Sequence, residues 1–375
     1  MTPEQQEIRE AVLKLCGRFD DAYWLRRDKE GGFPAEFHAA LAGDGWLGIA
    51  MPQDHGGAGL GITEAAVMMQ AIAESGAGFS GASAVHMNIF GLNPVVVFGS
   101  EEQKRRFLPP LVAGTDKACF AVTEPDAGLD TMRLKTKAEK RPDGYVLSGK
   151  KIWISTAQVA NRRVILARAP AGLTLFYTAL DRARVEVREI EKMGRKAVDS
   201  NQLFIDGLEV PEEDRIGEEG EGFKILLHGL NPERILIAAE AVGLGRAALA
   251  RAVRYAGERV VFGRAIGQNQ GVQHPLAKSW IELEAANLMT FRAAALYDAK
   301  SPCGAEANAA KYLAGEAGFN ACQTAVMTHG GYGYAREYHV ERYLREVMIA
   351  RIAPVSEQLI LCYVAERVLG LPKSY

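Results

Sequence analysis

The hydrophobic pattern of this chain changes character twice, and that change most limits what the chain can fold into. Between residues 119 and 205 the sequence is a series of short runs that either alternate apolar and polar residues or are continuously apolar. Such runs, separated by turn residues, are typical of strands. The predicted strands are 119–123, 145–147, 151–155, 163–168, 173–180, 185–190 and 202–205. So many short strands in one stretch predict a small β-barrel or sandwich.

Helical patterns flank this segment on both sides. The segments TPEQ at 2–5 and SEEQ at 100–103 are capping boxes, each ahead of apolar residues at helical spacing. Between them, apolar helices are expected at 63–74 and 84–98. After GEEGEGF at 217–223 the helices return, long and rich in alanine and leucine. We expect them to break at 263–271, 301–304 and 330–333.

The order of these patterns, helices then strands then helices, predicts an α+β chain of several domains. We expect an N-terminal helical domain at 1–118, a central β-domain at 119–222 and a C-terminal helical domain at 223–375. No G-x-G-x-x-G motif follows a predicted strand, so a doubly wound dinucleotide fold is disfavoured. The glycine-rich HGGYGY at 329–334 follows a helical stretch and is a weak signal in isolation.

Charge and cysteine content narrow the function classes. The 44 Lys and Arg residues nearly balance the 46 Asp and Glu residues, for a formal charge of −2, so nucleic acid is not an expected partner. The 5 cysteines are scattered without a C-x-x-C pair and the 7 histidines lack metal-ligand spacing, so no metal site is predicted. A charged N-terminus and the lack of a long apolar run predict a cytoplasmic protein with no membrane partner.

Two short segments carry residue types that suit a flat or anionic ligand. TEPDAGLD at 123–130 leaves a predicted strand and turns sharply, which brings backbone N–H groups to the surface; the simpler interpretation is a tight turn capped by Asp130. In KIWIS at 151–155, Trp153 and Ser155 fall on one face of a strand. An indole beside a hydroxyl suits a planar heterocycle, although such a tryptophan is more often part of the core.

The segment NPERILIAAE at 231–240 places an acid at the head of a long alanine-rich helix. One interpretation is mechanical, because Asn231 is a good N-cap, Pro232 suits the first helical position and Glu233 complements the helix dipole. The other interpretation is that Glu233 is a catalytic base. The local sequence leaves both open.

Taken in order, these segments resemble the acyl-CoA dehydrogenase family. The series is TEPDAGLD, KKIWIS, KMGR at 192–195, GEEGEGF, ERVVFGRAIGQNQ at 258–270 and HGGYGY, and the similarity covers essentially the whole chain. The resemblance implies an N-terminal helical domain, a central β-barrel and a C-terminal four-helix bundle. It also implies an FAD-dependent homotetramer of fatty acid metabolism that oxidises an acyl-CoA to the trans-2-enoyl-CoA and passes electrons to an electron-transfer flavoprotein.

The resemblance also assigns roles to single residues. Those that would border the flavin ring are Val122, Thr123, Trp153 and Ser155, with Ser356 in place of the family's flavin-contacting threonine. Those that would reach the FAD of a neighbouring subunit are Arg259, Phe262, Gln270 and Gly331. Leu129 falls among the substrate-binding positions, where the family usually has serine or threonine.

The position of the base separates this chain from many relatives. The family's usual glutamate near the C-terminus is replaced by Pro354, which accepts no proton. In long-chain and isovaleryl-type members the base lies in a Glu-Arg pair on a helix of the C-terminal domain, and Glu233-Arg234 matches that pair. This favours Glu233 over Glu357 and Glu240. Arg234, also a substrate-site residue, either orients Glu233 or pairs with a neighbouring acid.

The resemblance implies that Pro354 removes a backbone N–H that the family uses for the enolate oxygen. Either a neighbouring amide, such as that of Val355, replaces it, or the local alignment is shifted by one residue. Two alternatives to a dehydrogenase stay open. One is an oxidase-type member of the same fold, and the other is a flavin-binding member with little turnover, like DNA-associated relatives. The slightly acidic composition disfavours the second.

Overall fold

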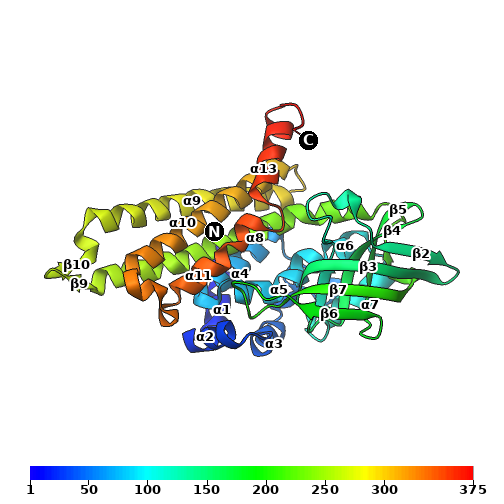
Figure 1. Ribbon diagram of the computed structural model, residues 1–375, viewed down its shortest axis with the longest axis horizontal. Coiled ribbons are helices and arrows are strands. Elements are labelled where there is room, and N and C mark those ends of the chain that lie inside the picture. The colour runs from blue at the N-terminus through cyan, green and yellow to red at the C-terminus, as the bar shows by residue number, and fades with distance from the viewer. Residues whose placement is uncertain (375) are drawn as a thin grey trace.

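The computed structural model describes residues 1–374, and residue 375, the last of the expected C-terminal domain, lies outside them. The chain builds a helical N-terminal part, a β-sheet domain and a second helical part, in the order that the sequence pattern predicts (Figure 1). In Figure 1 the long helices α8, α9 and α10 run side by side away from the β-domain, and α13 projects from the body near the C-terminus.

The N-terminal helices begin where the sequence places caps. The Thr2 side chain accepts a hydrogen bond from the backbone N–H of Gln5, whose side chain accepts one from Thr2 N–H, and Ser100 and Gln103 repeat the arrangement. The predicted helix 84–98 is wrong as one element, because a π-helical turn, Met87–Gly91, divides it. The helices are α1 Pro3–Cys16, α2 Asp21–Glu30, α3 Ala35–Gly43, α4 Ile62–Ile72, α5 Gly78–His86, α6 Asn93–Phe98 and α7 Glu101–Val112.

The β-domain is one eight-stranded sheet in the order β6-β7-β3-β2-β4-β5-β8, with β1 parallel to β4. Its strands are β1 Ala118–Ala121, β2 Lys137–Arg141, β3 Gly144–Ser155, β4 Arg162–Ala169, β5 Gly172–Ala179, β6 Val185–Glu189, β7 Ser200–Pro211 and β8 Arg215–Ile216. β3 joins two runs predicted as separate strands. It stays one strand by absorbing register shifts against β7 between Leu147 and Gly149 and between Lys151 and Ile154.

The C-terminal part is a bundle around one very long helix. Its elements are α8 Gly222–Glu258, the hairpin β9 Val260–Val261 with β10 Arg264–Ala265, α9 Gln270–Asp298, α10 Gly304–His329, α11 Val340–Val347, α12 Ile349–Ile352 and α13 Glu357–Tyr363. The three predicted breaks between these helices are confirmed. Gly243 lets α8 approach α4 closely, because a Cβ there would lie 2.3 Å from the Gln70 carbonyl oxygen.

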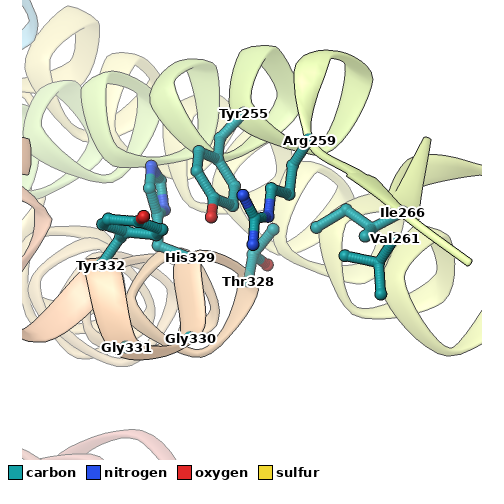
Figure 2. A pocket seen from close by; sticks show the side chains of 9 residues that line it. All are labelled: Tyr255, Arg259, Val261, Ile266, Thr328, His329, Gly330, Gly331 and Tyr332. Atoms are coloured by element: carbon teal, nitrogen blue, oxygen red, sulfur yellow. The ribbon is translucent and has the colours of Figure 1, made fainter.

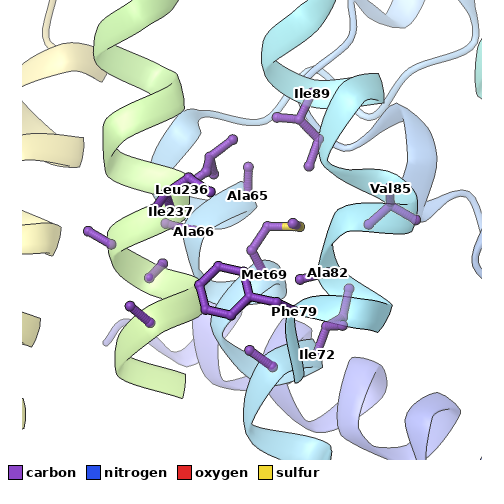
Figure 3. Close-up of a cluster of buried hydrophobic side chains, with 14 of the residues drawn as sticks. Ala65, Ala66, Met69, Ile72, Phe79, Ala82, Val85, Ile89, Leu236 and Ile237 are labelled. Carbon is purple, nitrogen blue, oxygen red and sulfur yellow. The ribbon is translucent and has the colours of Figure 1, made fainter. Parts of the chain in front are cut away.

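The core that positions the site lies between α4, α5 and α8. Apolar side chains of the three helices face one another there (Figure 3), among them Met69 from α4, Phe79 from α5 and Leu236 from α8, all fully buried. Close packing of this kind fixes side chains in single rotamers. The three helices therefore form a rigid frame for any polar group placed between them.

Two stretches, Ile62–Phe98 and Val340–Val368, are apolar and long enough to cross a membrane, so the prediction that no run approaches that length is wrong. The first stretch is 76% buried inside the fold, as a core segment is. In the second, α12 ends at Ile352 and α13 begins at Glu357, with non-helical residues between them. Length and composition alone are weak evidence for a membrane span.

Candidate active site

Glu233 lies in the interior of α8 and not at its start. The helix begins at Gly222, so Asn231 and Pro232 are helical residues, and the predicted N-cap is wrong. The sequence misled because Gly229 and Pro232 are poor helix formers, and the packing of α8 overrides their propensities. Glu233 is only 3% exposed, so complementing a helix end in water does not explain the acid.

The Glu233 carboxylate has an ionic neighbour from the N-terminal part. His86, the last residue of α5, places Nε2 3.6 Å from Glu233 Oε1 and Nδ1 2.5 Å from Glu240 Oε1. Burial acts to lower the pKa of His86, but the charges of Glu240 and Glu233 outweigh burial and raise that pKa to about 9. At neutral pH His86 is therefore an imidazolium between two buried carboxylates.

The second carboxylate oxygen of Glu233, Oε2, is not hydrogen-bonded to His86. Oε2 is buried and accepts no hydrogen bond from the described residues. Oε2 of Glu240 also lacks a hydrogen bond from the described residues. An unpartnered buried carboxylate oxygen is costly, but it is what a base needs at the place where a proton arrives. Of the two acids, Glu233 is the one whose other oxygen lies beyond hydrogen-bond length of His86, at 3.6 Å.

Arg234 is held by groups of its own helix. Its Nη1 donates to the backbone carbonyl of Leu230 at 3.3 Å and to Asn231 Oδ1 at 3.2 Å, one turn back on the same helix. Among residues 1–374 it forms no ion pair with an acid. Burial lowers its pKa against the opposing charge of Glu233, so the two side chains interact through space.

The segment that carries Pro354 is tied to the bundle next to Glu233. Lys311 from α10 is buried and its Nζ donates to the Val355 carbonyl at 2.6 Å. Burial lowers the pKa of Lys311 to about 8, against the charges of Glu233 and Glu357. Ser356 caps α13, its hydroxyl accepting a hydrogen bond from Leu359 N–H.

Glu357, the rival base, is engaged elsewhere. Its two carboxylate oxygens accept hydrogen bonds from Arg351 Nε at 2.9 Å and Arg351 Nη2 at 3.2 Å. A bidentate arginine pair leaves a carboxylate little freedom to move toward a substrate. The structure thus separates a committed Glu357 from a Glu233 with a free oxygen.

Ser155 lies beside a buried arginine that the sequence did not single out as a site residue. Arg195 donates from Nη1 to Ser83 Oγ at 3.1 Å and from Nη2 to Ser155 Oγ at 3.0 Å, so it joins α5 to the end of β3. Trp153, two residues earlier on β3, is 57% exposed with a left-handed backbone, φ 61°, and Ile154 between them is buried. The indole is thus left open on the surface.

The loop that holds Val122 and Thr123 is fixed by a buried ion pair. Lys151 Nζ from β3 donates to the Val122 carbonyl at 3.0 Å and to Glu124 Oε1 at 2.9 Å. Burial lowers the pKa of Lys151 to about 8, whereas Lys151 and backbone donors lower the pKa of Glu124 despite its burial. Leu129, further along the loop, is 58% exposed.

A second group of predicted residues lies at the far end of α8, where a cavity of about 520 Å³ opens. Figure 2 shows Tyr255 and Arg259 from that end facing the segment 328–332. The Tyr255 and His329 rings stack with centroids 4.3 Å apart, and Gly331 also lines the cavity. Phe262, at the turn of the β9–β10 hairpin, is fully exposed, and Gln270 begins α9.

The structure therefore places these predicted site residues in three regions. Val122, Thr123, Trp153 and Ser155 lie in the β-domain, Glu233 lies on α8 facing α5, and Arg259, Phe262, Gln270 and Gly331 lie at the other end of the bundle. At ~1.5 Å per residue, the helix places about 37 Å between Glu233 and Glu258. That span exceeds the length of one extended dinucleotide.

Sequence reasoning missed His86, Glu240, Arg195 and Lys311 as neighbours of the site. Glu240 follows Glu233 by seven residues, two helical turns, so their shared face was readable from the sequence. His86 is 154 residues from Glu240. No local signal relates positions so far apart in the chain.

Comparison with known proteins identifies the fold and the chemistry. Family models of the acyl-CoA dehydrogenase N-terminal, middle and C-terminal domains match residues 2–115, 119–208 and 220–369. The chain is 36% identical to the acyl-CoA dehydrogenase FadE12 of Mycobacterium tuberculosis, over 99% of this chain and 97% of that protein. It is 33% identical to CarC, a subunit of the caffeyl-CoA reductase–Etf complex of Acetobacterium woodii, over 88% of this chain and 89% of that protein.

Among solved structures, the butyryl-CoA dehydrogenase of Megasphaera elsdenii is similar with a TM-score of 0.94 and 30% identity, over 98% of this chain and 99% of that one. The class is that of flavin-dependent oxidoreductases with FAD as cofactor. The chain belongs to the acyl-CoA dehydrogenase family, and its reaction is the flavin-dependent dehydrogenation of an acyl-CoA thioester.

The residues present fit FAD. The guanidinium of Arg259 suits a pyrophosphate, because its planar fork bonds two oxygens at once. A Cβ added to Gly330 or Gly331 would meet no atom within 4 Å, so the space beside the cavity is open. Trp153 and Phe262 are exposed aromatic side chains, which a planar ring or a second subunit would cover.

Proposed function

We propose that Glu233 is the base that removes the α-proton of the acyl-CoA substrate. The observation that carries this proposal is a buried carboxylate that is held loosely: Oε2 of Glu233 accepts no hydrogen bond from the described residues and Oε1 lies 3.6 Å from His86 Nε2, whereas Glu240 is held by His86 at 2.5 Å. The replacement of the family's usual glutamate by Pro354 and the commitment of Glu357 to Arg351 support it. FAD, when bound, supplies the acceptor for the hydride that leaves the β-carbon.

The residues around Glu233 have separate tasks in this reaction. As the α-proton passes to Glu233, charge develops on the thioester oxygen and needs donors. Pro354 offers no N–H, so we assign this donor to the Val355 amide, in a segment that Lys311 anchors. Burial of the site excludes water, which strengthens each of these interactions.

The remaining residue roles belong to the same proposal. Val122, Thr123, Trp153, Ser155 and Ser356 border the flavin of their own chain, and Arg234 and Leu129 lie along the substrate path. We assign Arg259, Phe262, Gln270 and Gly331 to the FAD site of a neighbouring copy, because ~37 Å of α8 separates Glu233 from the end of the helix. The active form is then an oligomer, a homotetramer by family resemblance.

Further parts of the proposal concern the electron acceptor, the location and the domain limits. We propose an electron-transfer flavoprotein as acceptor, because a relative is named as the subunit of a complex with one. A cytoplasmic location, a role in fatty acid metabolism and domain boundaries at 1–118, 119–222 and 223–375 complete the proposal.

The test is anaerobic mixing of the FAD-loaded protein with acyl-CoA thioesters of different length and branching. Bleaching of the oxidised flavin absorbance by one class, with the matching enoyl-CoA as product, is the expected result and names the substrate. Reoxidation by an electron-transfer flavoprotein faster than by air distinguishes a dehydrogenase from an oxidase. A flavin that stays oxidised with every thioester contradicts the proposal.

A further inference from the structure

We propose that His86 and Glu240 are a positioning pair that holds Oε1 of Glu233 and thereby directs Oε2 toward the substrate. This inference rests on the proposed role of Glu233 as the base. It adds two residues from different parts of the chain, one on the N-terminal helix α5 and one on α8, to the machinery of the reaction.

The geometry has one fixed contact and one open contact. Glu240 is fully buried and its Oε1 lies 2.5 Å from His86 Nδ1, so the imidazole ring is held at hydrogen-bond distance. The same ring turns Nε2 toward Glu233 Oε1 at 3.6 Å, which is an ion-pair distance beyond ordinary hydrogen-bond length. Glu240 therefore fixes the imidazole ring, and the ring in turn holds Oε1 of Glu233.

The frame around these groups is apolar and rigid. Val85 precedes His86 on α5, while Leu236 and Ile237 lie between Glu233 and Glu240 on α8; all three are buried in the cluster drawn in Figure 3. A histidine on α5 and two acids on one face of α8 meet across this packed layer. Rotamers fixed by such packing are what keeps a catalytic group in a productive geometry.

The charges that face the triad come from three directions. From α8, both carboxylates face His86, and Arg234 acts on Glu233. From α10, Lys311 acts on Glu233. From the β-domain, Arg195 acts on Glu240.

The imidazolium form is the one that suits the arrangement. Protonated, His86 offers an N–H to each carboxylate. A neutral ring that donated to Glu240 would turn a lone pair toward Glu233 Oε1 and repel it. The arrangement therefore depends on a charged histidine.

The experiment uses the FAD-loaded holoenzyme and an acyl-CoA that bleaches the wild type. His86→Gln is expected to slow flavin reduction at pH 7 at least ~10-fold with substrate affinity changed less than ~2-fold, because positioning of a base affects chemistry more than binding. The acid limb of its pH–rate profile is expected to move to higher pH, since the opposite charge beside the base is lost. A merely structural histidine would leave that limb in place.

Glu240→Gln supplies a second variant and a readout other than activity. It keeps an oxygen that accepts from His86 but removes a charge, so the imidazole should titrate at lower pH. The His86 Cε1–H resonance of the holoenzyme, assigned by its loss in His86→Gln, measures this. The control is His38→Gln on α3, which alters a buried histidine whose pKa burial lowers to about 4, and which should keep the wild-type rate per bound FAD.

The outcomes separate this inference from the proposed function. Wild-type rates and pH profiles in both His86→Gln and Glu240→Gln, alongside an inactive Glu233→Gln, overturn the positioning pair and leave the base in place. Wild-type flavin reduction by Glu233→Gln overturns the base and the pair with it. An unshifted His86 titration in Glu240→Gln also overturns the pair.

Discussion

At the scale of single residues, the centre of the account is a buried group of two carboxylates and one imidazole. Burying charge is expensive unless it is paired, and His86 pairs both acids at once. Oε2 of each acid lacks a hydrogen bond from the described residues, but Glu240 is held by His86 Nδ1 at 2.5 Å, whereas Glu233 lies 3.6 Å from His86 Nε2. This asymmetry gives a chemical role to one acid and a positioning role to the other.

The free energy of unfolding should also depend on the charge of the His86 imidazolium. The pKa of His86 is raised from 6.5 to about 9 in the folded protein, so its stabilising effect is complete below pH 6.5 and is lost as the pH rises through about 9. The difference in free energy of unfolding between wild type and His86→Gln should therefore shrink over this range, by at most ~1.4 kcal/mol per pH unit. Urea unfolding at several pH values measures it, and a difference that stays constant contradicts the shift.

The candidate base could be predicted from the sequence, but its surroundings could not. Pro354 excludes the family's usual position, and Glu233 stands in a matching Glu-Arg pair, so both observations are local. His86 lies in an apolar helix with nothing beside it in sequence to indicate a charged partner. Its pairing with α8 exists only because the packing of α5 against α8 brings the two together.

At the scale of elements, the position of the loop 122–130 depends on a side chain of the separate strand β3. Lys151 on β3 contacts Val122, Glu124 and Leu166 from a fully buried position. The exposed end of β3, with Trp153, and the loop are thereby held together. Lys151 is therefore needed to position any cofactor that contacts both segments.

Lys151→Met should release that loop. Breaking a buried ion pair from one side costs ~3–5 kcal/mol, because it leaves the other charge buried without a partner. We expect a lower Tm and a protein purified with much less FAD, measured by calorimetry and by the flavin to protein absorbance ratio. The matched control is Lys150→Met on the neighbouring exposed residue, and equal effects of the two substitutions would contradict the anchoring role.

Secondary structure could be predicted where the hydrophobic periodicity was strong. The prediction failed where backbone pairing or helix packing determined the structure. The alternation of helices, strands and helices and the two capping boxes are local properties and are confirmed. β2 was missed because KAEKR at 137–141 buries only Ala138 and pairs with β3 and β4 through its backbone. The start of α8 was misplaced because Pro232 suggested a first turn, whereas the helix runs through it.

At the scale of the whole molecule, a continuous α8 separates the two halves of the proposed FAD site. The end that carries Arg259 opens a cavity, and the other end, which begins at Gly222 ahead of Glu233, packs against β5 of the β-domain. On the proposed assignment of the FAD contacts, two copies of the chain bring both halves to one FAD. Cofactor binding and assembly are thus expected to be linked.

Mixing variants tests the shared site. Arg259→Ala should weaken FAD binding roughly 10- to 100-fold, the loss of a charged hydrogen bond of ~1.5–3 kcal/mol, and Glu233→Gln should bind FAD without reducing it. In an oligomer that contains both variants, one FAD site combines the intact Glu233 of the Arg259→Ala chain with the intact Arg259 of the Glu233→Gln chain. Flavin reduction should therefore return in part on mixing. Arg259→Ala mixed with a chain that carries both substitutions is the control, and recovery there, or none in the test mixture, contradicts a shared site.

The central claim is that Glu233 takes the α-proton. The most direct measurement is the rate of anaerobic flavin reduction by a saturating acyl-CoA in wild type, Glu233→Gln and Glu357→Gln, each loaded with FAD. The account predicts that Glu233→Gln binds the thioester but reduces its flavin at least ~10²-fold more slowly, the lower range for losing a general base, while Glu357→Gln stays within ~10-fold of wild type. Reduction by Glu233→Gln at the wild-type rate, or its loss only in Glu357→Gln, would show that the proton goes elsewhere.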